Sequence, residues 1–559
     1  MIIKKQITNN IDFINNLILT ISFLFLANKT LTLFIFNVSI DGLLKSIFFK
    51  ISLFSLLFAI LIIFFSFTYS IRLNKYIIYL IVFLSLSTDY FMRSFGVLLD
   101  ETLFQSLFES STNEALQYYH FSYFIEVGIC LISFIFIYQK LKFTDFTILN
   151  TLKTFFQGLG LSVLIVFIVG VFFYKDCASF FRNNRSVRHL VNPINTLYQS
   201  YNYINFLYSD KTTTFVQISD DAKMTTTKKP KLFVFILGET ARSSNFSING
   251  YARNTNPNLI KENNLVNFEN VTSCGTATAI SVPCLFSDKN RSEFNRNKDM
   301  KRENIIDILN KVGFNSTWVE NNTGCKGVCD RITNFDLATL KNNEICNVGG
   351  CYDEILVNAF NKIIDQPISK TAVQTLNNQN PKPTYGNQAI YLHMLGSHGP
   401  TYYLRYPDKF GEFKPVCNSS KLSDCTSNSI INTYDNTILY TEHIISEVIK
   451  KLKASPQYDS VLVYVSDHGE SLGERGVYLH SLPYIIAPKE QKQIPFFFWF
   501  SDSYYKNESV RINNIKNKTK CSLSHDNVFH SLIGAFKIKS KFHDNTLDIF
   551  NEKFKCLKK

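Results

Sequence analysis

Five long stretches with almost no charged residues lie in the first third of this 559-residue chain. Each is long enough to cross the ~30 Å hydrocarbon core of a bilayer as an α-helix. A cleavable signal peptide would account for the first stretch alone. The pattern therefore predicts five transmembrane helices, although Asn28 and Lys29 interrupt the first stretch and leave a count of four open. The stretches cover about residues 14–37, 46–67, 76–92, 121–138 and 155–174.

Basic residues in the short loops predict the orientation of these helices. They precede the first stretch and follow the second and fourth, while the loop at 97–119 carries acidic residues and an apolar rhythm typical of a short surface helix. Placing the basic loops inside puts everything after Tyr174 outside the cytoplasm. The basic residues are Lys4, Lys5, Arg72, Lys75, Lys140, Lys142 and Lys153.

The net charge of +13 is spread along the chain rather than gathered in a basic and aromatic array. This distribution excludes the usual pattern of a nucleic-acid-binding protein and fits a membrane protein that faces anionic lipid.

Eight of the 12 cysteines form four close pairs. Their spacings lack the repeated two-residue gap and the interleaved histidines of a structural zinc cluster. They predict short disulfides in an oxidising compartment instead. Cys177, Cys521 and Cys556 have no assigned partner. The pairs are Cys274 and Cys284, Cys325 and Cys329, Cys346 and Cys351, and Cys417 and Cys425.

The remaining pattern predicts three regions: a transmembrane domain at 1–175, an amphipathic bridging helix and linker at 176–230, and a metal-dependent catalytic domain at 231–559. In the last region apolar strands alternate with helices, which is typical of an α/β fold with a mostly parallel sheet covered by helices on both faces. Strands are predicted at 232–238, 316–320, 389–396, 460–466 and 495–501, and helices at 302–312, 351–364 and 431–453.

Three of these strands run directly into side chains that bind metals: Glu239, His398, and the adjacent Asp467 and His468. Each alone has a structural explanation, as a helix cap or a hydrogen-bonded histidine. Open α/β sheets, however, deliver ligands to the crevice beyond their strand ends, and three ligand-bearing ends favour a metal site. Mixed nitrogen and oxygen ligands favour Zn²⁺ over Mg²⁺, with Mn²⁺ as the alternative.

The segment SCGTATAISVPC at 273–284 supplies hydroxyl groups that could act as a nucleophile. A metal would lower the pKa of such a hydroxyl, and a disulfide between Cys274 and Cys284 would hold the loop. The candidates are Ser273, Thr276, Thr278 and Ser281, and the chemistry does not choose between Thr276 and Thr278.

Four motifs together resemble the phosphoethanolamine transferases of Gram-negative envelopes, a family that includes lipid A modifying enzymes and mobile colistin-resistance enzymes. They are GETARSSNFSINGYARNTNPNL, SCGTATAISVPCLFS, SHGPTYYLRYP and SDHGESLGERGVYLH. The resemblance implies an alkaline phosphatase-like, sulfatase-type catalytic domain.

The resemblance also implies roles for individual residues. Thr278 would be the nucleophile, with His398 and His480 assisting catalysis and with one tightly bound Zn²⁺ joined by a second during turnover. The implied zinc ligands are Glu239, Thr278, Asp467 and His468. The implied substrate-binding residues are Asn322, Lys326, His393, His398, Glu470 and His480, and the four cysteine pairs match the disulfides of the family.

The reaction implied by the resemblance is transfer of phosphoethanolamine from phosphatidylethanolamine through an intermediate on Thr278, with release of diacylglycerol. The expected acceptor is lipid A or lipooligosaccharide, with another glycan or a protein as alternatives, and the result would be reduced sensitivity to polymyxin. The resemblance implies a monomer in the inner membrane with its catalytic domain in the periplasm.

Three other functions compete with this hypothesis. A sulfatase or related phosphohydrolase needs a modified Cys or Ser followed by Pro and Arg, whereas Ile280 and Val282 stand at those spacings after Thr278. A phosphoglycerol transferase of the lipoteichoic-acid-synthase type would share the five spans and a Thr nucleophile, but the SCGT…SVPC segment favours phosphoethanolamine transfer. A non-enzymatic scaffold would be expected to lack a ligand or the nucleophile, and none is missing.

Overall fold

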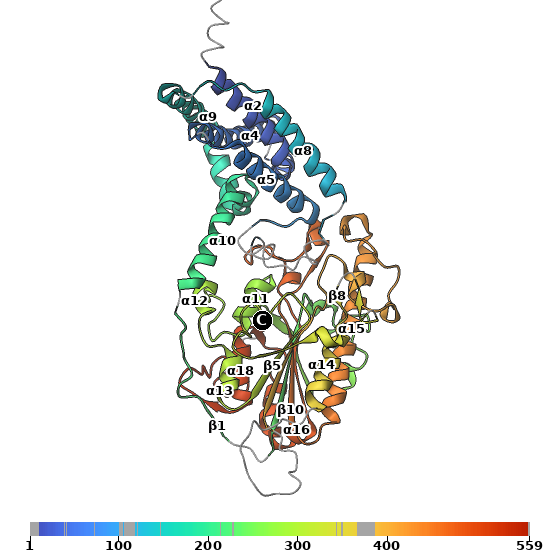
Figure 1. The fold of residues 1–559 in the computed structure, drawn as a ribbon. Helices are drawn as coiled ribbons and strands as arrows, with labels where there is room; N and C mark the ends of the chain where they lie inside the picture. The colour runs from blue at the N-terminus through green and yellow to red at the C-terminus, as the bar shows by residue number, and fades with distance from the viewer. Residues whose placement is uncertain are drawn as a thin grey trace, which may run out of the picture. The chain divides into compact units, whose positions relative to one another are not determined.

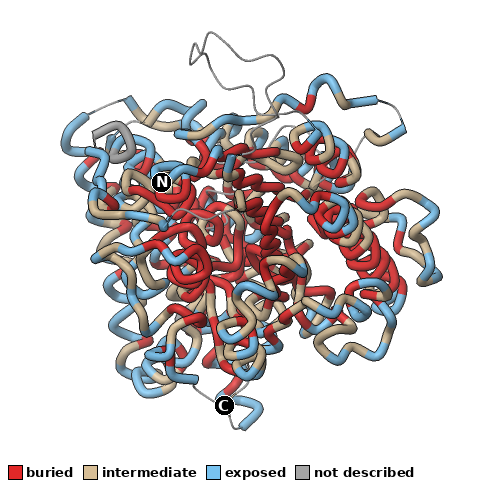
Figure 2. The backbone as a smooth tube through the Cα atoms, turned by 90° about the horizontal axis from the view of Figure 1, so that it is seen from below, coloured by how far each residue is buried: buried red, intermediate tan, exposed pale blue. Residues whose placement is uncertain are grey.

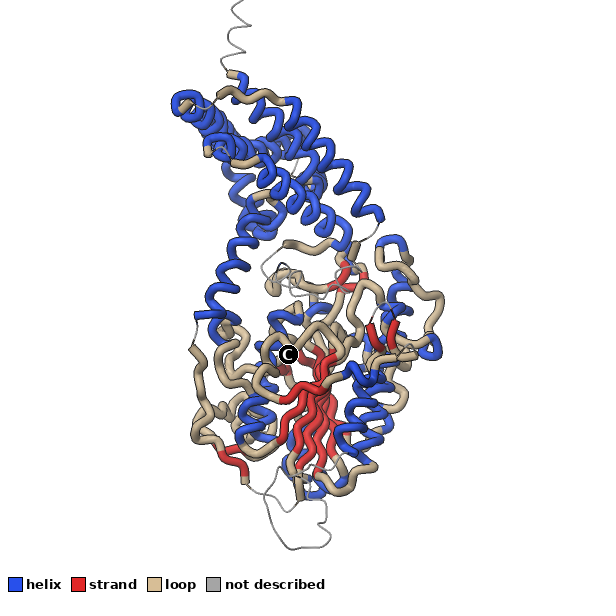
Figure 3. The backbone as a smooth tube through the Cα atoms, in the orientation of Figure 1, coloured by secondary structure: helices blue, strands red, loops and turns tan. Residues whose placement is uncertain are grey.

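The computed structural model describes residues 10–556 apart from 39, 41, 72, 100–103, 105–117, 120, 146, 213, 226–228, 343, 348–349 and 366–385. The chain divides into two compact units. We call Met1–Glu101 with Tyr119–Tyr203 the membrane unit, and Thr102–Tyr118 with Ile204–Lys559 the α/β unit. The membrane unit is helical, and all strands lie in the α/β unit among the described residues (Figures 1 and 3).

Four helices of the membrane unit are long and apolar enough to span a bilayer. A fifth span exists if α2 and α3, which are bent by 75° at their junction, count as one. The predicted count of four to five is therefore confirmed. The helices are α2 (Ile11–Ala27), α3 (Lys29–Asn37), α4 (Leu43–Ser70), α5 (Lys75–Phe95), α8 (Phe121–Lys140) and α9 (Ile148–Asn183).

The bend between α2 and α3 lies at the two polar residues that interrupt the first apolar stretch. The buried Asn28 amide donates to the Asn192 carbonyl at 3.2 Å, and its side-chain oxygen accepts from the Asn192 N–H at 3.0 Å. Lys29 Nζ lies 2.7 Å from Glu126 Oε1. Because these groups are paired inside the unit, polar residues are tolerated within an apolar region.

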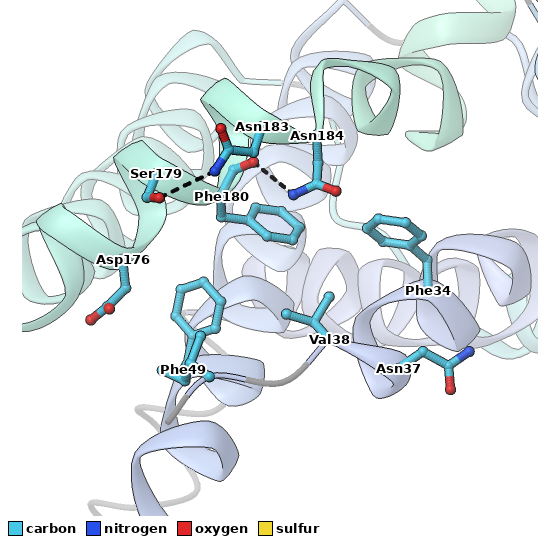
Figure 4. A pocket seen from close by; sticks show the side chains of 10 residues that line it. Phe34, Asn37, Val38, Phe49, Asp176, Ser179, Phe180, Asn183 and Asn184 are labelled. Carbon is cyan, nitrogen blue, oxygen red and sulfur yellow. Dashed lines mark hydrogen bonds between the residues drawn. The ribbon is translucent and has the colours of Figure 1, made fainter. Parts of the chain in front are cut away.

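A cavity of about 430 Å³ lies between α3, α4 and α9 (Figure 4). Phe34, Phe49 and Phe180 line one part of it, and amide side chains including Asn183 line another. Its one carboxylate, Asp176, pairs with Lys45 at 3.0 Å. This lining offers no group of ligands for a metal.

The predicted bridging region at 176–208 is mostly helical. Its first part continues α9, and a short 3₁₀ helix at Arg185–Leu190 and helix α10 (Ile194–Thr212) follow. The short helix predicted at 97–119 falls largely outside the described residues. The three predicted domain boundaries stay predictions.

The α/β unit contains a seven-stranded sheet in the order β3-β13-β10-β2-β9-β5-β6. All its neighbouring strands are parallel except the pairs that β13 forms with β10 and β3. The sheet is therefore mixed but mostly parallel, and the predicted strand at 495–501 is the one that runs in the opposite direction. The strands are β2 (Lys231–Gly238), β3 (Leu265–Phe268), β5 (Asn315–Glu320), β6 (Thr333–Phe335), β9 (Gln388–His393), β10 (Asp459–Ser466) and β13 (Phe496–Phe500).

Helices cover both faces of this sheet, whose central strands are buried (Figures 1 and 2). One face packs against α11 (Thr278–Leu285), α13 (Ile305–Lys311) and α18 (Asp526–Ala535). The other packs against α14 (Glu354–Asp365) and α15 (Ser427–Lys453). Short helices α12 (Arg296–Asp299), α16 (Asp502–Asn507) and α17 (Ser509–Lys516) complete the set.

Four two-stranded ribbons lie outside the main sheet. They pair β1 (Lys223–Met224) with β15 (Ile538–Lys539), β4 (Asn270–Thr272) with β14 (Ser522–Ser524), β7 (Cys346–Asn347) with β8 (Gly350–Cys351), and β11 (Ser471–Leu472) with β12 (Tyr478–Leu479).

The α/β unit also contains five disulfides. Four join the cysteine pairs expected from the sequence, and the fifth joins Cys521 to Cys556, for which no partner was assigned. Cys130 and Cys177 are free and buried in the membrane unit.

Candidate active site

Three adjacent parallel strands bring the predicted ligands to one edge of the sheet. Glu239 directly follows β2, and Asp467 and His468 directly follow β10. Strand β9 ends at His393, so His398, which was expected directly after this strand, lies in the loop beyond it. Because β10, β2 and β9 are neighbours that run in the same direction, their carboxyl ends meet there. Glu239, Asp467 and His468 are all buried, and each offers an atom within 4.8 Å of the others.

These three residues and Thr278 form what we call the metal cluster. Around His468 Nε2, Asp467 Oδ2 lies at 3.2 Å, Thr278 Oγ1 at 3.3 Å and Glu239 Oε1 at 3.5 Å. Thr278 Oγ1 is also 3.2 Å from Glu239 Oε2. Two carboxylates, an imidazole and a hydroxyl thus converge on one point.

The hydrogen bonds of the metal cluster fit a bound cation. His468 Nδ1 is 2.9 Å from the Gly469 carbonyl, which assigns the ring proton to Nδ1 and leaves a lone pair on Nε2. Asp467 Oδ2 is buried and has no hydrogen-bond donor among the described residues. Lone pairs that face one another in a buried site repel unless a cation lies between them. The nitrogen and oxygen donors suit Zn²⁺.

Of the four candidate hydroxyls, that of Thr278 is the one that contacts the side chains of Glu239 and His468. The buried Thr276 hydroxyl donates to the Leu482 carbonyl at 2.6 Å, and Ser273 donates to the Gly275 carbonyl at 2.5 Å. Ser281 donates to the main-chain carbonyl of Asp467. Thr278 begins α11 and is partly exposed, so the geometry favours it over Thr276.

Thr240 connects the two carboxylates of the metal cluster. Its N–H donates to Asp467 Oδ1 at 3.0 Å, and its hydroxyl donates to Glu239 Oε1. Its φ of +57° is rare for a β-branched residue, so surrounding contacts must hold it. One of them is the hydroxyl of Tyr434 on α15, which donates to the Thr240 carbonyl at 2.7 Å.

A second group at the same edge consists of His393, Glu320 and Asn322, which we call the histidine clamp. His393 Nδ1 lies 3.0 Å from Glu320 Oε2, and its Nε2 lies 3.2 Å from Asn322 Nδ2. Asn322 Nδ2 also donates to Glu239 Oε2 at 2.7 Å. Both ring nitrogens of His393 therefore have partners, and the clamp reaches the metal cluster through Asn322.

His480, His398 and Glu470 lie beside the metal cluster. The rings of His480 and His468 have centroids 4.4 Å apart, and His398 is 5.7 Å from His480. His480 Nδ1 is 3.4 Å from Glu470 Oε2. The structure thus gathers these predicted site residues beside the metal cluster.

Burial and charge shift the pKa values of this site strongly. Burial and then the charge of Glu239 raise the pKa of Asp467 to about 6. Burial alone would raise the pKa of Glu239, but the imidazoles of His468, His398 and His480 and the Thr240 hydroxyl together outweigh this effect, and the pKa lies below its usual range. Burial lowers the pKa of His480 well below its usual range, so its imidazole is neutral at pH 7. Burial and the Glu239 charge raise the pKa of Glu470 well above its usual value.

Comparison with known proteins gives the family. Residues 231–538 match the model of the sulfatase family, and residues 57–208 match that of phosphoethanolamine transferase EptA/EptB. Phosphoethanolamine transferase EptA of Escherichia coli K12 is 36% identical over 85% of both chains. The chain belongs to the phosphoethanolamine transferase family.

Two further relatives are similar to this chain over most of its length. Phosphatidylethanolamine transferase Mcr-1 of Escherichia coli is 34% identical over 84% of this chain and 85% of its own. The structure of the integral membrane protein lipooligosaccharide phosphoethanolamine transferase A from Neisseria meningitidis superimposes with a TM-score of 0.86 at 30% identity, covering 96% of this chain and 97% of that chain.

Lys326 of this transferase lies on the same loop as Asn322 and contacts Thr323. Its ammonium donates to the carbonyl and hydroxyl of Thr323 at 3.0 and 3.1 Å. Asn322, four residues earlier, is the residue of this loop that contacts the metal cluster. The nearby pair of Cys325 and Cys329 lies close to Asp330, but both thiols are in a disulfide and cannot bind a metal as thiolates.

Several residues that position the site of the transferase were not predicted from the sequence. Buried Asp353 accepts from the N–H groups of Leu395 and Gly396 at 2.9 and 2.8 Å, which fixes the loop after β9. A Cβ on Gly396 would lie 2.7 Å from the Glu239 carbonyl, so this close approach requires glycine. His525 accepts from the Cys274 N–H at 3.1 Å, and burial lowers its pKa to about 3.

The sequence alone contains little that identifies Thr240, Asp353 or His525 as residues that position the site. Thr240 lies in the GETAR motif beside Glu239, but neither its left-handed backbone nor its bond to Asp467 can be inferred from one sequence. Asp353 and His525 are distant in sequence from every strand end considered.

Proposed function

We propose that this protein transfers phosphoethanolamine from phosphatidylethanolamine to an envelope acceptor. The observation that carries the proposal is the Thr278 hydroxyl, partly exposed and 3.2–3.4 Å from two carboxylate oxygens and an imidazole nitrogen. The acceptor we propose is lipid A or lipooligosaccharide, because the full-length relative with the same fold is named for lipooligosaccharide.

Thr278 is the nucleophile in this proposal. Its oxygen attacks the phosphorus of the donor, the bond to the glycerol oxygen breaks, and diacylglycerol leaves after taking up a proton. Phosphoethanolamine is then attached to Thr278 through a phosphodiester. An oxygen of the acceptor attacks the same phosphorus in the second step and frees the Thr278 hydroxyl.

Glu239, Thr278, Asp467 and His468 would hold one Zn²⁺. When bound, the ion would lower the pKa of the Thr278 hydroxyl and offset negative charge on the phosphate oxygens. Thr240 keeps both carboxylates in place for this role, through its N–H bond to Asp467 and its hydroxyl bond to Glu239.

His480 and His398 move protons or contact phosphate in this proposal. A neutral His480 can accept a proton, and the Glu470 carboxyl, whose pKa is raised, lies within reach of its Nδ1. Asn322 and Lys326 lie on one loop and would bind the phosphoethanolamine group, provided that Lys326 leaves Thr323.

The apolar helices of the membrane unit fit a lipid donor, since phosphatidylethanolamine is confined to a bilayer. We propose the bacterial inner membrane as the location, with the α/β unit in the periplasm, where disulfides persist. Addition of the amine would mask acceptor charge and reduce sensitivity to cationic peptides such as polymyxin.

Incubation of the full-length protein with head-group-labelled phosphatidylethanolamine tests the donor step. The expected result is a mass increase of one phosphoethanolamine on the peptide that contains Thr278, with release of diacylglycerol. Labelled phosphatidylglycerol is the control, and label transfer from that lipid instead would identify a phosphoglycerol transferase. Lipid A mass spectra of cells with and without the protein test the acceptor.

A further inference from the structure

A turn shortly after His480 exposes two adjacent isoleucines. Ile485 is 93% exposed and Ile486 is 48% exposed. Among the described residues from β2 onward, no other neighbouring pair of large apolar side chains is exposed in this way. This exposed apolar pair is therefore a candidate site of interaction.

The backbone of this turn is held in place. The N–H groups of Ile486 and Ala487 both donate to the Pro483 carbonyl at 2.9 Å, and Ala487 is buried. We call residues 483–488 the isoleucine turn. Its apolar side chains point outward from a hydrogen-bonded scaffold, so their exposure is a property of the fold.

Cationic and aromatic side chains surround the isoleucine turn. The guanidinium of Arg291 lies 3.4 Å from the centroid of the Tyr484 ring. Lys492 Nζ donates to the Tyr484 carbonyl at 3.2 Å, and Lys489 is exposed. Apolar residues beside a Tyr and several cations are the composition that enters the interface of an anionic bilayer.

Hydrogen bonds connect the isoleucine turn to the loop that precedes Thr278. The Ser481 N–H donates to the Thr276 carbonyl at 2.7 Å, and the Tyr484 hydroxyl donates to the Ser273 carbonyl at 3.0 Å. The hydroxyl of Thr276 in turn donates to the Leu482 carbonyl. A surface that contacts the isoleucine turn therefore lies close in the structure to the segment that carries the proposed nucleophile.

We propose that the isoleucine turn enters the interface of a phospholipid bilayer. Ile485 and Ile486 would lie among the upper acyl chains, while Lys489 and Lys492 would contact lipid phosphates. This contact would present residues 273–278 to a phosphate-bearing lipid at the membrane surface. The identity of that lipid as the donor rests on the proposed function, but the contact itself does not.

Charge favours a bilayer over a protein partner at this surface. Lipid phosphates at the bilayer surface complement the charges of the Lys489 and Lys492 side chains. Two apolar side chains are far fewer than a stable protein interface buries. A bilayer accommodates them singly, since acyl chains adapt to the inserted group.

Fluorescence quenching tests the contact without catalysis. Ile485→Cys is labelled with an environment-sensitive fluorophore in the full-length protein, reconstituted in nanodiscs that contain doxyl-labelled phospholipid. Val510→Cys, at a position 83% exposed on α17, is the matched control. The parent protein, treated with the same fluorophore, corrects for any labelling of Cys130 and Cys177. We expect a blue shift and quenching at 485 at least threefold stronger than at 510. Equal quenching at the two positions would overturn the proposal. The exposed isoleucines would then be better explained by contact with a protein partner.

Kinetics test the consequence for the substrate. Ile485→Ser with Ile486→Ser should raise KM for bilayer phosphatidylethanolamine about tenfold, because the apolar contribution to membrane contact is lost. The same variant should retain its kcat/KM for a short-chain donor used below its micelle concentration. An equal loss with both donors would mean that the turn acts on the site rather than on the bilayer. If neither donor reacts with the parent protein, the proposed function fails while the quenching result stands.

Discussion

Two groups of histidine and acidic residues lie at the same edge of the sheet, yet they differ in how their lone pairs are used. In the histidine clamp both nitrogens of His393 have hydrogen-bond partners, Glu320 and Asn322. In the metal cluster His468 Nε2 faces oxygens of Glu239, Asp467 and Thr278. The type of residue does not separate the two groups. What separates them is that His468 Nε2 faces oxygens of three residues, whereas each ring nitrogen of His393 faces one side-chain atom, and this favours the metal cluster as the candidate cation site.

The largest effect should come from removing the hydroxyl on which the chemistry depends. Thr278→Ala should reduce transfer by roughly 10⁴-fold or more, because no nucleophile replaces the missing oxygen. Zinc content and thermal stability should change little, since two carboxylates and His468 remain. Activity assays with mass spectrometry of the protein check both outcomes. Retained activity with the adduct on Thr276 would contradict the assignment.

Loss of a carboxylate in the metal cluster should mainly affect metal affinity. Asp467→Asn should weaken zinc binding by more than about 100-fold, the upper end for loss of a hydrogen-bond partner outside the ligand set. Competition with a chromophoric chelator measures this, and Asp544→Asn on the surface is the control.

The raised pKa of the Asp467 carboxylate should make metal binding depend on pH. The pKa of Asp467 is raised to about 6 without metal, so protons compete with the ion below that value. Zinc affinity of the parent protein should therefore rise as pH increases from 5 to 7 and then depend less steeply on pH. An affinity that is constant across this range would show that Asp467 is not a ligand.

The sequence predicted the main strands, and the reason is physical. Strands β2 and β10 are buried on both faces, so their apolar runs are nearly continuous. The ligand positions follow, because polar residues directly after such runs lie at the strand ends. Short strands such as β3 and β6 have only three or four residues and no comparable run.

What the sequence could not predict is the set of contacts between distant segments. The bond from Thr240 to Asp467 joins residues 227 positions apart, and that from Asn322 to Glu239 joins residues 83 positions apart. The choice of Thr278 over Thr276 likewise depends on which hydroxyl has a carbonyl partner in the folded chain. The resemblance to a family favours Thr278, and the geometry of the folded chain favours the same residue.

A smaller effect is expected from a residue that positions the ligands without binding the metal. Thr240→Val removes the hydroxyl that donates to Glu239 while it keeps the side-chain shape and the N–H bond to Asp467. Zinc affinity should fall about 10- to 100-fold, as for other partners of metal ligands. Thr240→Ser should restore it. If Ser and Val behave alike, backbone conformation rather than the hydroxyl explains the position.

The smallest effect should come from the histidine clamp, and its size tests the contrast between the two groups directly. Glu320 accepts from the Trp318 indole at 2.8 Å, from the Asn322 N–H at 2.7 Å and from His393, and these bonds hold Asn322 against Glu239. Glu320→Gln keeps the shape but weakens these bonds, because an amide oxygen is a weaker acceptor than a carboxylate. We expect a loss of about threefold to tenfold in zinc affinity, at the low end for outer partners.

The same chelator competition measures this loss, with Glu344→Gln on an exposed segment as the control. Since Glu320 acts on the metal cluster only through Asn322, Asn322→Ala should produce a loss at least as large, and adding Glu320→Gln to it should change little further. Additive losses would mean that Glu320 influences the metal by another route. A loss as large as that of Asp467→Asn would place the histidine clamp among the metal ligands and remove the distinction between the two groups.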